Sequence, residues 1–585
     1  MTGFLALVGP TGPAPDALAP DATWQGAGIR LLAAQADRPG GPALAARGGR
    51  AVAADLRLDG RAALRQRLGA PDASDAALIL AAYERWGEAF VDHVEGAYAA
   101  VVWDGPARRA VAARDALGLR PLYRARLGDG WALGSSLRDL RRLVPFDVDP
   151  VAVADFLTGD YVHPTRTLVA GVERVPPAHT VRIDADGALQ ERRYWALDPD
   201  RRLPDDDDTV ERAFREAFDA AVGDRLDDAT GAFLSGGLDS TSIVATARAL
   251  RPEPPLPVFA LVYDDQKADE RRYIDAAIDQ GGLVPHRVRG ESPSLMGRMR
   301  DDLRALGAPS LAPNLFLTRH LYDAARQQGL RAVLDGFGGD NVVAHGEQRL
   351  TELALGLRWP TFAREAVAAA ARTTRPRRMV LDLVRDFALA PLAEPFRRPT
   401  PAVHFGRADL VGERSLPDAR YRTVRASHLA ELGAARNALA LEAAYATAAA
   451  SGVEPRFPFF DRRVVEVCLA IPSAQRLRGG LTRSFLRRAM SGRLPDLVRD
   501  RSGKARIGGT FADALFHREP ASTRQAVYDE APQAADYLDV AALQRAFERA
   551  HADPAAQAEL ALPVWRAVSL ARWLADTDAN APDAP

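Results

Sequence analysis

The segment from Gly231 to Ala245 reads GAFLSGGLDSTSIVA, in which an apolar strand passes through two glycines directly into a helical pattern. A strand that feeds a helix through a tight turn is the unit from which parallel, doubly wound sheets are built. Apolar runs such as PVFALVY, HRVR and AVLDG alternate with helical patterns along the next hundred residues. The sequence therefore predicts an α/β parallel-sheet domain over 205–575, with a largely helical C-terminal part.

Residues 1–204 show a different pattern, in which short apolar strands such as AYAAVVWDG and HTVRID are separated by turns. One helix is predicted among them, SDAALILAAYERWG, with Ser74 or Asp75 as its N-cap. Because 585 residues are too many for a single core, the change of pattern marks a domain boundary, and we predict an α+β sandwich before it. The polar end of the chain, 576–585, is expected to be disordered.

The glycine turn has the composition of a phosphate-binding loop. Backbone N–H groups, a helix dipole and hydroxyl groups converge where such a strand meets its helix, and that point suits a phosphate. Asp239, in the first helical turn, either caps the helix or holds Mg²⁺ beside the phosphates. An ordinary capped turn is the alternative, and the absence of a Gly-Lys-Ser/Thr sequence excludes a Walker A loop. The predicted phosphate-binding residues are Leu234, Ser235, Gly236, Gly237, Asp239, Ser240 and Thr241.

A second glycine turn follows the apolar run AVL in RAVLDGFGGDN, which spans Arg331 to Asn341. Both turns are expected at the carboxyl edge of the same sheet, where doubly wound folds bind ligands. Asp335 and Gly336 are predicted to contact the nucleotide, and Asp340 is a second candidate Mg²⁺ ligand beside Asp239. Two such turns, each with an aspartate, are more specific than either alone.

Composition narrows the possible partners. A net charge of −1 gives no indication of nucleic-acid binding, and the sequence contains no apolar run of membrane-spanning length. Cys468 is the only cysteine, and the N-terminus lacks the pattern of a secretion signal, so a cytoplasmic protein is expected. Lys267 and Lys504 are the only lysines, which makes each a candidate for chemistry that arginine cannot supply.

The loop FLSGGLDS resembles the pyrophosphate-binding loop of the asparagine synthetase-like ATP pyrophosphatases. The stretches GVERVPPAHTVRID, DGFGGD and GVEPRFPFFDRRVVEVCLAIP extend the resemblance over most of the chain. It implies a glutaminase-like N-terminal sandwich followed by an ATP-pyrophosphatase domain, with ATP and Mg²⁺ as cofactors and an acyl-adenylate intermediate. It also implies that Val262 lies at the adenine, and that Lys504 stabilises charge on the reacting phosphorus and carbon.

Three departures from the family pattern are informative. Glutamine-dependent members carry a cysteine after the initiator methionine and an Asn-Gly-Glu motif, whereas this chain has Thr2 and VAADLRLDGR. We therefore expect no glutaminase activity. Phe337 occupies a position that asparagine synthetases fill with glutamate and β-lactam synthetases with tyrosine, which argues against both activities.

Glu442 is a candidate replacement base. It lies in the Ala/Leu-rich helix NALALEAAYATAAA, where burial would raise its pKa, although it would equally suit an exposed helix face. The third departure is a helical insertion, 346–427, in which Glu347 to Arg425 holds 15 Arg against 9 Asp plus Glu. It suits a carboxylate-bearing ligand such as a peptide, or forms a solvated cap. Phe337, Asn314 and His345 are the predicted peptide-pocket residues.

Together these departures resemble the lasso-peptide macrolactam synthetases, or lasso cyclases. The resemblance implies adenylation of an Asp or Glu side chain in a precursor core peptide, and ring closure by the peptide's own N-terminal amine. A leader peptidase and a leader-recognition protein are the implied partners. The alternatives are an ammonia-dependent asparagine synthetase, a β-lactam synthetase-like enzyme, and a catalytically silent binding protein that has kept the fold.

Overall fold

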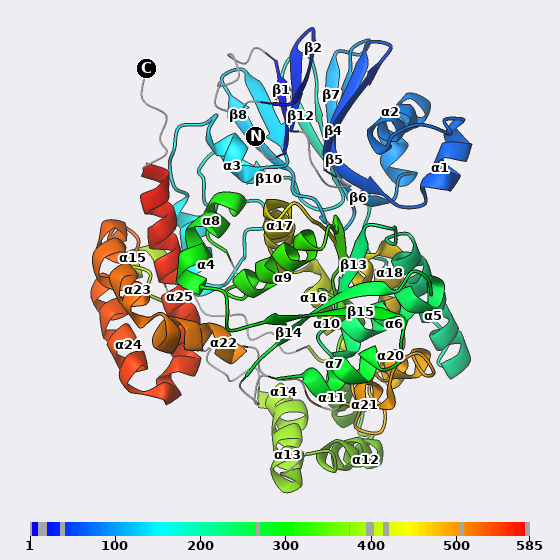
Figure 1. The fold of residues 1–585 in the computed structure, drawn as a ribbon, viewed down its shortest axis with the longest axis vertical. Coiled ribbons are helices and arrows are strands. Elements are labelled where there is room, and N and C mark those ends of the chain that lie inside the picture. The colour runs from blue at the N-terminus through cyan, green and yellow to red at the C-terminus, as the bar shows by residue number, and fades with distance from the viewer. Residues whose placement is uncertain are drawn as a thin grey trace.

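A computed structural model describes residues 3–9, 20–34, 41–264, 269–310, 312–373, 375–393, 403–412, 421–501, 503 and 508–578 (Figure 1). The N-terminal part contains two six-stranded antiparallel sheets, with strand orders β10-β8-β9-β1-β3-β2 and β12-β11-β7-β6-β5-β4. The strands are β1 (Phe4–Val8), β2 (Ala22–Gly26), β3 (Ile29–Ala33), β4 (Pro42–Arg47), β5 (Arg50–Leu58), β6 (Gly96–Asp104), β7 (Arg109–Arg114), β8 (Tyr123–Leu127), β9 (Gly130–Gly134), β10 (Val172–Arg174), β11 (His179–Ile183) and β12 (Leu189–Arg193).

The two sheets pack face to face, as the predicted α+β sandwich requires. One buried cluster joins Phe4, Leu31 and Leu133 of the first sheet to Ala53 and Val101 of the second. The outer face of the second sheet is covered by α2, whose N-cap Ser74 accepts a hydrogen bond from the Ala77 backbone N–H, as predicted. The helices of this part are α1 (Arg61–Leu68), α2 (Asp75–Trp86), the 3₁₀ turn η2 (Gly87–Asp92), α3 (Leu137–Arg141) and α4 (Pro150–Thr158).

The second part is built on a five-stranded parallel sheet, in the order β15-β14-β13-β16-β17. Successive residues of β13 face opposite sides: Ala232 joins the core formed with α5 and α6, and Phe233 the core formed with α9 and α17. Burial on both faces explains the apolar character of the central strands β13, β14 and β16. The elements are α5 (Asp207–Gly223), β13 (Thr230–Phe233), α6 (Leu238–Leu250), β14 (Leu256–Val262), α7 (Arg271–Ile278), β15 (Leu283–Arg289), α8 (Leu295–Leu306), α9 (Leu315–Gln327), β16 (Ala332–Leu334), α17 (Ala435–Ala450) and β17 (Glu454–Arg456).

Helices dominate the rest of the chain, as the sequence predicts. Those of the insertion and its flanks are α10 (Gly339–Val343), α11 (Gln348–Leu355), α12 (Trp359–Ala370), α13 (Pro376–Leu383), the π-helix η3 (Val384–Leu389), α14 (Ala390–Ala393), α15 (Ala408–Val411) and α16 (Val424–Gly433). The later ones are η5 (Pro458–Phe460), α18 (Arg462–Ala470), α19 (Ser473–Arg476), α20 (Ser484–Ala489), α21 (Asp496–Arg499), α22 (Gly508–Asp513), η6 (Ala514–Arg518), α23 (Pro520–Gln525), η7 (Ala526–Glu530), η8 (Ala531–Ala534), α24 (Val540–Ala552) and α25 (Pro554–Asp578).

Helices α12 and α13 project from one end of the molecule, whereas α22 to α25 lie together along one side of it, where α25 packs against α4 and α8 (Figure 1). Helix α25 continues to Asp578, so the predicted disordered tail, 576–585, is helical over its first three residues, and the remainder lies outside the described ranges. Among the described residues, no helix combines the length and the apolar character needed to span a membrane.

Candidate active site

The two glycine turns meet at the carboxyl edge of the sheet. Strands β14 and β16 pair in parallel with opposite sides of β13. The order in which successive strands are added to the sheet therefore reverses at β13. A Cβ on Gly336 would lie 3.1 Å from the Ser240 nitrogen, and one on Gly339 would lie 2.7 Å from the Asp239 Cβ. The loops therefore touch, and only glycine permits this approach. This is the position at which doubly wound folds bind ligands.

The first turn leaves the start of α6 open to an anion. Gly236 adopts a φ of 68°, and α6 begins after Gly237, which supplies no side-chain cap. Ser235 and Ser240 hold the turn, because their hydroxyl oxygens lie 3.0 Å apart and the Ser235 N–H donates to the Ser240 Oγ at 3.1 Å. The Thr241 hydroxyl is buried and has no hydrogen-bond partner among the residues that the structure describes. Free N–H groups at a helix start, flanked by hydroxyls, form a phosphate site.

The two predicted Mg²⁺ ligands converge on one cationic atom. The Arg483 Nη1 lies 2.8 and 2.9 Å from the carboxylate oxygens of Asp239 and 2.9 Å from the Asp340 Oδ1. His345 Nε2 lies 3.5 Å from the same Asp340 oxygen. Within the described ranges, no group of three or more His, Cys, Asp or Glu is placed to hold a metal. The pair fits Mg²⁺ as that ion is held in nucleotide sites, by one or two carboxylates together with substrate phosphates.

A cleft of about 490 Å³ opens beside these residues, and the insertion forms one of its walls. Arg372 and Met379 of the insertion line it together with Arg483, Arg487 and Arg501. Arg487 is buried and forms no ion pair among the described residues; burial and the nearby Arg483 lower its pKa to about 10. Arg501 donates to the Gly236 carbonyl at 3.1 Å. A concentration of arginines around a glycine turn is suited to a polyanionic substrate.

These arginines were not assigned from the sequence. Arg483 and Arg487 lie within GLTRSFLRRAM and Arg501 within VRDRSGK, but arginine carries nearly all the positive charge of this chain and each looked ordinary. Arg483 also has a φ of 53°, in the left-handed region that non-glycine residues rarely adopt. A strained backbone at the residue that contacts both aspartates indicates a functional position, because such strain concentrates at binding and active sites.

The structure places the other predicted residues as follows. Lys504 and Thr2 lie outside the described ranges. Gly503, the residue before Lys504, lines the cleft, and so does the predicted pocket residue His345. Val262 ends β14 at the same sheet edge. Asp335 is half-buried, its removal from water raises its pKa, and it accepts hydrogen bonds from Tyr322 Oη at 3.1 Å and the Phe337 N–H at 2.9 Å.

Two of the predicted peptide-pocket residues do not line the cleft. The ring of Phe337 packs 5.9 Å from that of Phe457 and 5.8 Å from that of Phe460, so its apolar side chain belongs to the core. Asn314 lies at the start of α9, and its Oδ1 is buried without a hydrogen-bond partner in the described part of the chain.

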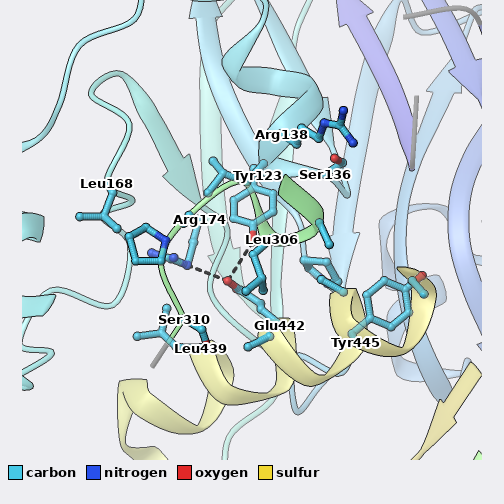
Figure 2. Close-up of a pocket in the computed structure, with 18 of the residues that line it drawn as sticks. Tyr123, Ser136, Arg138, Leu168, Arg174, Leu306, Ser310, Leu439, Glu442 and Tyr445 are labelled. Carbon is cyan, nitrogen blue, oxygen red and sulfur yellow. Dashed lines mark hydrogen bonds and ion pairs between the residues drawn. The ribbon is translucent and has the colours of Figure 1, made fainter. Parts of the chain in front are cut away.

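Glu442 is buried as predicted, but the expected rise in its pKa is wrong. Its carboxylate accepts hydrogen bonds from Arg174 Nε at 2.9 Å and Tyr123 Oη at 2.9 Å (Figure 2). It also accepts one from Arg114 Nη2 at 3.0 Å. Burial alone would raise the pKa, but the two arginines and these hydrogen bonds outweigh it and lower the value. Glu442 also lines a separate cavity at the domain interface rather than the cleft. Its position indicates that it joins the two domains.

Comparison with known proteins agrees with this geometry. Residues 213–575 match the asparagine synthase family, and residues 60–195 match the glutamine amidotransferase domain. Asparagine synthetase [glutamine-hydrolyzing] 3 of Bacillus subtilis is 25% identical over 446 residues, covering 72% of this chain and 69% of the relative. Asparagine synthetase [glutamine-hydrolyzing] 1 of the same organism is 23% identical over 459 residues, covering 73% and 70%. Amidase chry2 of Gibberella zeae is 25% identical over 297 residues, covering 46% and 42%.

The family match covers more than half of the chain, and it includes both glycine turns, the arginine cluster and the insertion. The amidotransferase match covers most of the sandwich but begins after β5, and so excludes the first strands. This protein therefore belongs to the asparagine synthase family, with an N-terminal glutamine amidotransferase-type domain and a C-terminal ATP-pyrophosphatase domain.

Proposed function

We propose that this protein is a lasso-peptide cyclase, which uses ATP to join an Asp or Glu side chain of a core peptide to that peptide's own N-terminal amine. The observation that carries the proposal is the cleft wall. The basic insertion lines the same cleft as Asp239 and Asp340, and its Arg372 would supply an additional cation for a carboxylate-bearing substrate. A free amino acid needs no wall of this size, whereas a folded peptide does.

The proposed reaction has two steps. In the first, an oxygen of the peptide carboxylate attacks the α-phosphorus of ATP, and pyrophosphate leaves with the bonding electrons. In the second, the N-terminal amine attacks the acyl carbon, AMP leaves, and the amine gives up a proton. The start of α6 and the cleft arginines would bind the pyrophosphate, and Asp239 and Asp340 would hold Mg²⁺, which neutralises phosphate charge. Lys504 would stabilise charge in both transition states.

We further propose that the N-terminal domain has no glutaminase activity. The chain has Thr2 in place of the nucleophilic cysteine. Asp55, in the stretch that replaces the Asn-Gly-Glu motif, accepts a hydrogen bond from Tyr445 of α17 and lies 3.4 Å from Arg120 Nε. A side chain committed to the domain interface is not free to hold glutamine. Glutamate release from glutamine at a rate above the buffer background would contradict this.

The insertion also offers a surface for the proposed partners, the leader peptidase and the leader-recognition protein. Many of the large apolar side chains that are most exposed in the described structure lie on it, and contiguous exposed apolar residues mark interaction sites. They are Leu355, Leu357, Trp359, Val367, Leu381, Leu389, Leu392 and Val403. The core peptide itself would enter through the adjoining cleft.

The test is ATP–pyrophosphate exchange with Mg²⁺ and leaderless core peptides that carry an Asp or Glu within ring-forming distance of the N-terminus. Peptide-dependent exchange, together with loss of one water from the peptide mass, supports the cyclase. The names of the bacterial relatives favour one second candidate, an ammonia-dependent asparagine synthetase. Exchange with free aspartate but not with peptide would replace the proposal by that activity. Failure to bind ATP at all would instead indicate a silent binding protein.

A further inference from the structure

A second cavity, of about 560 Å³, lies between the N-terminal sandwich and helices α8, α9 and α17 (Figure 2). It shares no lining residue with the cleft that holds Asp239, within the described part of the chain. Its volume is in the range of small-molecule sites, which run from about 300 to 1,000 Å³. The cavity is therefore large enough to be a binding site in its own right.

The walls of the cavity are mainly apolar. Leu306 is the last residue of α8, and Leu439 and several alanines belong to α17. The N-terminal part of the chain supplies Phe156 and Leu168. Figure 2 shows Leu168, Leu306 and Leu439 around the same space as Glu442. An apolar lining with a few placed polar groups is typical of sites that bind a small organic molecule.

Most charged groups in the cavity already have a partner. Glu442 is held by two arginines, and Asp155 lies 2.9 Å from His163 Nδ1. The lining arginines that form ion pairs are Arg166 with Asp149, Arg174 with Glu442, Arg304 with Asp576 and Arg319 with Asp302. One lining carboxylate, Asp301, is exposed, so that water can solvate it. These groups do not require a ligand.

Two lining groups are different. Arg138, which is half-buried, makes no hydrogen bond or ion pair with any residue that the structure describes. The hydroxyl of Tyr161 is buried and likewise has no hydrogen-bond partner there. Buried polar groups in folded proteins are almost always paired, so the unpaired Tyr161 hydroxyl indicates a missing acceptor in the cavity. Arg138 lines the same cavity and supplies a guanidinium without a carboxylate partner among the described residues. Both groups are donors, and a carboxylate is the acceptor that a guanidinium binds best.

We propose that this interdomain cavity binds a small, largely apolar carboxylate. The carboxylate pairs with Arg138, Tyr161 donates its hydroxyl proton to a second acceptor of the ligand, and the apolar body packs between Leu306 and Leu439. Such a carboxylate belongs either to a free organic acid or to the C-terminus of a peptide. The site is separate from the cleft and does not rest on the reaction proposed there.

The test is isothermal titration calorimetry on the full-length protein with N-acetyl-L-phenylalanine and with its uncharged amide. The acid is expected to bind with a Kd below about 1 mM, and the amide at least about tenfold more weakly, because only the acid pairs with Arg138. Arg138→Gln should remove this difference. Arg126→Gln, a change at an exposed arginine that donates to the Gly128 and Asp129 carbonyls and lies over the Trp131 ring, should preserve it.

A blocking variant separates this site from the cleft. Leu439→Trp fills the cavity and should abolish binding of the acid, while binding of ATP with Mg²⁺ and the melting temperature stay close to wild type. If Leu439→Trp does not fold, the proposal is tested by Arg138→Gln alone, in which the acid should bind no more tightly than the amide. Equal binding of acid and amide by the wild type, no binding of either, or unchanged binding in the folded Leu439→Trp variant would each overturn the proposal.

A tripeptide ending in phenylalanine, with a free or an amidated C-terminus, identifies the source of the carboxylate. If the free-acid tripeptide binds at least tenfold more tightly than N-acetyl-L-phenylalanine, the natural ligand is the C-terminus of a peptide. Equal affinity of the two acids identifies a small organic acid. Either result supports the site, and the same Arg138→Gln dependence is required of both.

Discussion

Glu442→Gln distinguishes a domain-joining carboxylate from a catalytic base. The substitution keeps the size of the side chain but leaves Arg114, which is fully buried, and Arg174 without their negative partner. Breaking a buried ion pair by removing one member costs about 3–5 kcal/mol, because the remaining charge stays desolvated. The same substitution at an exposed ion pair, Glu173→Gln beside Arg124, should cost no more than about 1 kcal/mol.

Stability is measured by urea unfolding, followed by far-UV circular dichroism. The lowered pKa of Glu442 fixes the sign of the pH dependence. A carboxyl group with a depressed folded-state pKa stabilises the fold above its unfolded value, about 4.3, and loses that contribution as pH falls through the folded value. The difference between wild type and Glu442→Gln should therefore be constant from about pH 8 to pH 5, and decrease below that range.

Adenylation provides the second readout. Glu442 does not line the cleft, so ATP–pyrophosphate exchange by the folded variant should stay within about tenfold of wild type, and Glu442→Asp should recover part of the stability. The reasoning would be refuted by an unchanged urea midpoint together with a loss of ring closure of a hundredfold or more. That combination would identify Glu442 as the catalytic base.

Three further predictions concern the cleft and the core. Gly339→Ala should reduce ATP turnover and cost about 1–3 kcal/mol, because the new Cβ would meet the Asp239 side chain, whereas Gly433→Ala, at a glycine that has open space and likewise no positive φ, should leave both unchanged. Asp239→Asn and Asp340→Asn should each lower Mg²⁺-dependent ATP–pyrophosphate exchange by about a hundredfold, and full exchange in both would exclude a metal role. Only Asp340→Asn should leave the melting temperature unchanged, because Asp340 is exposed, whereas Asp239 forms a buried ion pair with Arg483. Cys468 is fully buried, which raises its pKa to about 12, so its thiol should react with a thiol reagent at pH 8 only after the protein is unfolded.

The sequence was sufficient to predict the features that depend on local pattern. The strand–turn–helix unit at Gly231 to Ala245, the second glycine turn and their meeting at one sheet edge follow from strand rhythm and glycine placement. The alternation of short strands in the first half was enough to predict the sandwich. These features are set by neighbours along the chain, and the topology of parallel sheets brings the carboxyl ends of adjacent strands together.

The chemistry of individual side chains depended on contacts that sequence does not reveal. Glu442 meets Arg114 and Arg174, which are 328 and 268 positions away, and Arg483 meets Asp239 from 244 positions away. The pKa of a buried group depends on whether opposite charges lie within a few ångströms to offset the loss of water. A carboxylate in an alanine-rich helix could therefore be predicted to be buried, but only the tertiary structure decided that two arginines keep it ionised.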